Sequence, residues 1–88
     1  MMKPVFKLKA GDLIHPKRTI NDQQIKNWKY ASECDSVSGG LMSHAELTIV
    51  DLCHRHPEIW VKACMNSFSP PRHLKISGEE LSWNFKLV

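Results

Sequence analysis

The residues best suited to chemistry lie in DLCHRHPEIW, residues 51–60, where one cysteine and two histidines stand together. Thiolate and imidazole are preferred zinc ligands, and Cys53 and His56 could form a Cys₃His set with Cys34 and Cys64. The spacing disfavours this set, because the chain has no Cys-x₂-Cys pair and we expect Cys34 to lie on a different element. We therefore expect no metal and no other cofactor, and keep the four residues as the alternative.

A thiol beside an imidazole could also serve as a nucleophile with its base. No catalytic signature accompanies Cys53 and His56. Ser38-Gly39-Gly40 is too short for a phosphate-binding loop, and Glu79-Glu80 stands where we expect an exposed turn. The sequence therefore predicts a protein that is not an enzyme.

The interpretation that we favour for residues 51–60 is a junction between two helices. Pro57 cannot continue a helix from its amino-terminal side, but it suits the first position of a new one. His54 and Arg55 would then lie at the carboxyl end of the first helix, where positive groups complement the helix dipole. In this interpretation the stretch positions its neighbours and has no chemistry of its own.

Start and stop signals predict three helices, near residues 21–34, 43–55 and 57–68. Asn21 with Gln24, and Ser43 with Glu46, have the spacing of capping boxes.

Alternation of apolar and polar residues predicts strands near residues 4–9 and 81–88. Residues 73–76 would form a hairpin with the last strand through a turn at 77–80. Leu81, Trp83, Phe85 and Leu87 would share its buried face. We also expect a turn at Ala10-Gly11-Asp12 and a short strand starting at Leu13. The expected fold is a single α+β domain over residues 1–88, with three helices packed on a small antiparallel sheet.

The order of a helix pair followed by a hairpin is compatible with a winged helix. The helix predicted near residues 57–68 would then have to read DNA bases, which requires Arg, Lys, Asn or Gln side chains. It offers only Lys62 and Asn66, and its start carries Glu58, which repels phosphate. The architecture fits nucleic-acid binding better than the side chains do.

Charge is distributed unevenly along the 88 residues, whose net charge is +3. Residues 1–30 carry seven Lys or Arg against two Asp, a net charge of +5, and the remainder carries −2. A basic segment of this kind favours an anionic partner. The residues that we expect to bind the partner are Lys7, Lys9, Lys17, Arg18, Lys26, Lys29 and Tyr30.

Composition narrows the class of protein further. No stretch reaches the roughly 18 apolar residues of a membrane span, so we expect no membrane partner. The three cysteines are an odd number without the spacing of a disulfide framework, which favours the cytoplasm. We predict a small regulatory or inhibitory protein that contacts another protein with an acidic surface. The alternative is a nucleic-acid-binding regulator.

Overall fold

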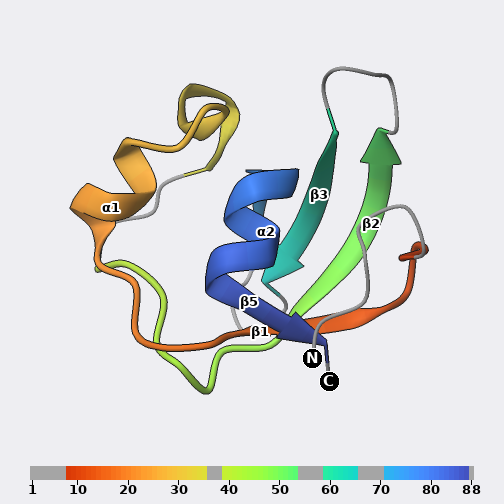
Figure 1. The fold of residues 1–88 in the computed structure, drawn as a ribbon, viewed down its shortest axis with the longest axis horizontal. Helices are drawn as coiled ribbons and strands as arrows, with labels where there is room; N and C mark the ends of the chain where they lie inside the picture. The colour runs from red at the N-terminus through yellow and green to blue at the C-terminus, as the bar shows by residue number, and fades with distance from the viewer. Residues whose placement is uncertain (1–7, 36–38, 54–58, 66–70, 88) are drawn as a thin grey trace.

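The computed structural model describes residues 8–35, 39–53, 59–65 and 71–87 (Figure 1). The described chain forms a five-stranded sheet and two α-helices. The strands are β1 (Leu13–Pro16), β2 (Leu47–Cys53), β3 (Trp60–Met65), β4 (Arg72–Ser77) and β5 (Phe85–Leu87). The helices are α1 (Asp22–Lys26) and α2 (Gly78–Asn84), with a 3₁₀ turn, η2 (Ala31–Glu33), after α1.

The sheet is antiparallel throughout, in the order β4-β3-β2-β1-β5. Strands β2, β3 and β4 follow one another in sequence and in space. Helix α2 then leads the chain from β4 at one edge to β5 at the other, where β5 pairs with β1 (Figure 1). The long connection between β1 and β2 carries α1 and η2.

The prediction of three helices on a small sheet is wrong, because most of the described residues of the two later helices form strands. The segment predicted as a helix over residues 43–55 contains β2 instead. Its consecutive β-branched residues Thr48, Ile49 and Val50 favour an extended backbone. A register shift between Ile49 and Asp51 leaves Val50 exposed, while Ile49 stays buried.

The segment predicted as a helix over residues 57–68 contains β3. Val61, Ala63 and Met65 are buried and Lys62 between them is exposed, which is the period of a strand with one face toward the core. Without either helix, the expectation of a winged helix is wrong as well. Pro57, the predicted junction, lies outside the described residues.

The prediction of one strand over residues 81–88 is wrong as well. Helix α2 occupies Gly78–Asn84, and only Phe85–Leu87 are extended. Ser77 caps this helix, because its hydroxyl accepts a hydrogen bond from the backbone N–H of Glu80 at 3.3 Å. Leu81 of α2 and Phe85 directly after the helix are both buried, so this side of α2 covers the core.

Other expectations are confirmed. Asn21 and Gln24 form a capping box, although α1 ends at Lys26 and is much shorter than the predicted helix over 21–34. The turn at residues 10–12 and the short strand after it are present, and β4 covers the expected residues 73–76. The hairpin expected between residues 73–76 and the last strand is wrong, because α2 separates β4 from β5 and the two strands lie at opposite edges of the sheet. In the expected strand over residues 4–9, residues 8 and 9 are not extended in the sheet, and residues 4–7 lie outside the described part.

The core lies on one face of the sheet, beneath α1, α2 and the connection after β1. Trp28 meets Phe85 edge-on there, with ring centroids 5.9 Å apart. The connection is fixed by a two-way backbone pairing of Ile20 with Leu41, at 2.7 and 2.8 Å. Gly40 permits this approach, because it has a φ of 72° and an added Cβ would lie 2.2 Å from the carbonyl oxygen of Ile20.

Candidate functional site

Two of the predicted binding residues, Lys17 and Arg18, lie against the carboxyl end of α2. The backbone N–H of Lys17 donates to the carbonyl of Asn84 at 2.7 Å, and its ammonium donates to the carbonyl of Ser82 at 2.9 Å. Arg18 Nη2 donates to Asn84 Oδ1 at 3.0 Å. Both side chains are exposed, so their positive charges face solvent while α2 holds their positions.

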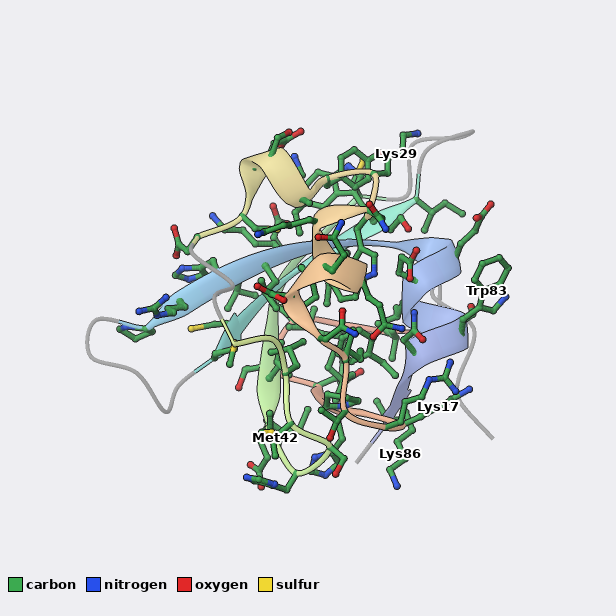
Figure 2. All side chains as sticks on the ribbon, turned by 90° about the vertical axis from the view of Figure 1, so that its left-hand side faces the viewer. Lys17, Lys29, Met42, Trp83 and Lys86 are labelled. Carbon is green, nitrogen blue, oxygen red and sulfur yellow. The ribbon has the colours of Figure 1, made fainter. Side chains whose placement is uncertain are left out.

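The other predicted cations lie elsewhere. Lys26 faces Asp22 at 3.9 Å on the exposed side of α1, an ion pair of little energetic weight. Figure 2 shows Lys29 well separated from Lys17. Lys9 is exposed near the turn before β1, and Lys7 lies outside the described residues. The structure therefore divides the basic third of the sequence between separate parts of the surface.

Tyr30 is not an exposed aromatic residue, since only 7% of it is accessible. Its ring meets that of Trp60 edge-on at 6.2 Å. Lys75 Nζ lies 4.2 Å from the Trp60 ring centroid and 5.3 Å from that of Tyr30. Lys75 also hydrogen-bonds and ion-pairs with Glu33, which raises the pKa of its ammonium group. This packing indicates a structural role for Tyr30.

Residues 34–35, just after η2, cover the outer edge of β4. Cys34 Sγ accepts a hydrogen bond from the backbone N–H of Lys75 at 3.1 Å and donates to the carbonyl of Tyr30 at 3.4 Å. Asp35 Oδ2 accepts from the backbone N–H of His73 at 2.8 Å, and Asp35 N–H donates to the His73 carbonyl at 3.0 Å. Burial raises the pKa of the Cys34 thiol, with nearby Asp35 and Glu33 adding to the effect. The thiol is therefore a neutral part of the edge cover.

The structure does not bring together the described cysteines of the alternative metal set. Cys53 is opposite Trp60, and Cys64 lies four positions further along β3, which separates them by about 13 Å. Two thiolates on one zinc ion lie within about 5 Å of each other, because each Zn–S bond is about 2.3 Å. His56 lies outside the described residues, within which no group of three or more His, Cys, Asp or Glu could hold a metal ion.

The most exposed large apolar side chain in the described part of the chain is Trp83, at 64% accessibility. It lies on α2 directly after Ser82, whose carbonyl binds the Lys17 ammonium. Lys86 follows on β5, exposed and paired in the sheet with His15 of β1. Figure 2 shows Trp83, Lys17 and Lys86 on the same side of the molecule. We call Lys17, Arg18, Trp83 and Lys86 the Trp83 surface.

The reasoning from sequence missed Trp83 and Lys86 as surface residues, because it assigned them to a single strand. A signal was present in Ser77-Gly78-Glu79-Glu80, which has the S-x-x-E spacing of a helix start. Reading α2 from that signal places Leu81 and Phe85 on the buried face and turns Trp83 away from it.

Carboxylates lie at the other end of α2. Glu79 is exposed one turn before Trp83, and Glu80 Oε2 accepts a hydrogen bond from Asn84 Nδ2 at 2.6 Å. Partial burial raises the pKa of Glu80, and the Asn84 hydrogen bond opposes that shift. Acidic groups at the start of α2 and cations at its end both complement the helix dipole. The Trp83 surface is thus bordered by charges of both signs.

Comparison with models of protein families, with curated proteins and with solved structures finds no match to this chain. Within the described residues, no helix is long and apolar enough to cross a membrane.

Proposed function

We propose that this chain is a small regulatory or inhibitory protein of the cytoplasm, without enzymatic activity, that acts by contact with another protein. Its partner presents an acidic surface to Lys17 and Arg18, the part of the basic first third that lies against α2. The observation that carries the proposal is the arrangement of Lys17 and Arg18, whose exposed charges are already fixed on α2. Charged groups held in place before binding lose less conformational entropy when a partner arrives.

A nucleic-acid-binding regulator is the second candidate, and one observation favours it. The exposed Trp83 lies beside Lys17, and an aromatic ring with nearby cations suits the stacking of a base and the binding of its phosphate. Glu79 and Glu80 on the same helix argue for the protein partner, because a nucleic-acid backbone is negative along its whole length.

Affinity capture from a lysate of the source cells, with and without nuclease, tests the choice between the two. We expect the wild-type chain to retain a protein after nuclease treatment, and Lys17→Glu with Arg18→Glu to lose it. Lys62→Glu is the matched control, because Lys62 is an exposed lysine on β3 whose neighbours Val61 and Ala63 face the core that α2 covers. Retention that disappears with nuclease, together with binding of random oligonucleotides, would decide for nucleic acid.

A further inference from the structure

We infer that the contact surface is centred on Trp83, and that its occupant is a protein surface with an apolar pocket bordered by carboxylates. The inference rests on the proposed function, since it specifies which part of this chain meets the partner. It also moves the centre of binding from the basic first third to the place where that third meets α2 and β5.

The fold does not require a tryptophan at position 83. Helix α2 reaches the core through Leu81, and Phe85 directly after the helix is fully buried and packs on Trp28. Trp83 lies on the opposite side and remains 64% exposed. Large aromatic side chains that fill a pocket on the partner dominate the binding energy of protein interfaces, and tryptophan is among the residues most enriched at such positions.

The surrounding cations retain the capacity to bind carboxylates. The Lys17 ammonium has three donors, and one of them meets the Ser82 carbonyl. Arg18 has five N–H donors in a planar fork and uses one nitrogen on Asn84. Lys86 is exposed on β5. Carboxylates on the partner can therefore form charge-assisted hydrogen bonds with these groups while the contacts to α2 remain.

The charges along α2 determine the class of occupant. Glu79 is four residues before Trp83 and shares its side of the helix, whereas Lys17 and Arg18 lie at the far end. A complementary partner surface is acidic where it meets Lys17 and Arg18, and basic or neutral where it meets Glu79. Its apolar pocket for Trp83 lies between these two regions. A folded protein or a peptide can present this pattern, but a polyphosphate chain cannot. This complementarity selects a protein partner over nucleic acid.

The test uses the full chain and two defined probes. Random 12-residue peptides displayed on phage are selected on the immobilised wild-type protein, and (dT)₂₀ is titrated separately. We expect selected peptides to combine Asp or Glu with large apolar residues. Trp83→Ala should weaken their binding by about 30-fold, the effect of a central interface residue, and Trp83→Phe should weaken it less.

Two controls match the variants. Met42→Ala removes another exposed apolar side chain, 53% accessible and distant from Trp83 in Figure 2. Lys62→Glu reverses an exposed cation on β3 whose neighbours Val61 and Ala63 face the core. Both should leave peptide binding unchanged, and circular dichroism should show all variants folded.

Each remaining outcome overturns the inference in a distinguishable way. Peptides that bind Trp83→Ala as tightly as wild type, but lose affinity with Lys26→Glu and Lys29→Glu, would leave the proposed function intact and relocate its surface. Binding of (dT)₂₀ that depends on Trp83, without any peptide binder, would overturn the protein partner as well. Absence of any binder that depends on Trp83 would remove the Trp83 surface as a binding site.

Discussion

Trp83 and Trp28 occupy opposite environments, and their replacement by alanine separates a surface role from a core role. Trp83 is 64% exposed and Trp28 is 6% exposed. We expect Trp83→Ala to change the free energy of unfolding by no more than about 0.5 kcal/mol, as at other surface positions. Trp28→Ala should cost about 3–5 kcal/mol, the range for a buried large aromatic residue. Urea denaturation measures both, and a large loss with Trp83→Ala would show that this side chain is part of the core.

Gly40 is the residue at which a single added methyl group should do most damage. Its φ is 72°, and the new Cβ would lie 2.2 Å from the Ile20 carbonyl, within the pairing of Ile20 with Leu41. Gly39 has a φ of 89° but open space around its Cβ position, so it is the matched control.

Gly39→Ala should cost about 1–2 kcal/mol through its positive φ alone. Gly40→Ala should cost about 2 kcal/mol more, because the clash is with backbone that cannot move without breaking the pairing. Thermal or urea unfolding gives both values. Equal losses in the two variants would show that the connection adapts to the added Cβ.

Glu80 should make stability depend on mildly acidic pH. Burial raises its pKa above the ordinary 4.5 in the folded chain, so the folded state binds a proton more readily than the unfolded state. Its contribution to stability is complete below the ordinary pKa and is lost as pH rises through the raised one.

The comparison of wild type with Glu80→Gln isolates this contribution, because glutamine does not titrate. As pH falls from about 7 to about 4, the unfolding temperature of wild type should rise relative to that of Glu80→Gln. A constant difference between the two proteins across this range would show that Glu80 titrates alike in both states.

At the scale of elements, the cover over β4 protects an edge that would otherwise be open to another strand. Asp35→Ala removes the carboxylate that accepts from the His73 N–H, but not the backbone bond from Asp35 to the His73 carbonyl. We expect a loss of about 1 kcal/mol, faster hydrogen exchange at His73 and a greater tendency to self-associate. Asp51→Ala is the control, because Asp51 is an exposed aspartate whose side chain accepts a hydrogen bond from the N–H of Leu52, away from the edge of β4. Unchanged exchange at His73 would contradict the role of Asp35.

The two S-x-x-E sequences show how far local signals can determine elements. Ser43 to Glu46 has the spacing of a helix start, but β-branched residues follow it and the chain enters β2. Ser77 to Glu80 has the same spacing and does begin a helix, α2. The segment after Ser43 becomes a strand because it pairs with β1 and β3, and this tertiary effect cannot be recognised from the local sequence.

The residues after Ser77 were misjudged for a different reason. Leu81 and Phe85 are four apart, a spacing that satisfies both a period of two and a helical turn. Trp83 between them decides the assignment only once its environment is known. Short signals with a local mechanism, such as the capping box of Asn21 and the turn at residues 10–12, were predictable from sequence.

At the scale of the whole molecule, sequence position did not predict which charges gather. The basic first third contributes Lys17 and Arg18 to one side, while Lys29 lies far from them (Figure 2). Lys86, from the far end of the sequence, joins the first group because β5 pairs with β1. The surface could not be assembled from sequence, since it depends on a pairing between distant segments.

This arrangement predicts a moderate salt dependence of partner binding. We expect the affinity of the wild-type chain for its protein partner to fall as salt rises from about 0.05 to about 0.5 M, because exposed charges are screened. The log–log slope should be shallower than for a ligand that neutralises several phosphates, where each contributes about 0.9. Lys17→Glu with Arg18→Glu should flatten the slope, and Lys26→Glu with Lys29→Glu should preserve it. A steep slope for all variants would contradict this assignment.

The pairing of β5 with β1 also determines when the molecule can mature during synthesis. Strands β2, β3 and β4 are neighbours in sequence, so their contacts close short loops and can form early. Strand β1 has only β2 as a neighbour until residues 85–87 arrive on its other side. The contacts of Lys17 and Arg18 with α2 likewise await Ser82 and Asn84. A nascent chain that lacks residues 82–87 cannot form the Trp83 surface, because β1 then has no β5 to pair with and Lys17 and Arg18 have no α2 to contact. We therefore expect partner binding only after these residues have been synthesised and have packed against β1.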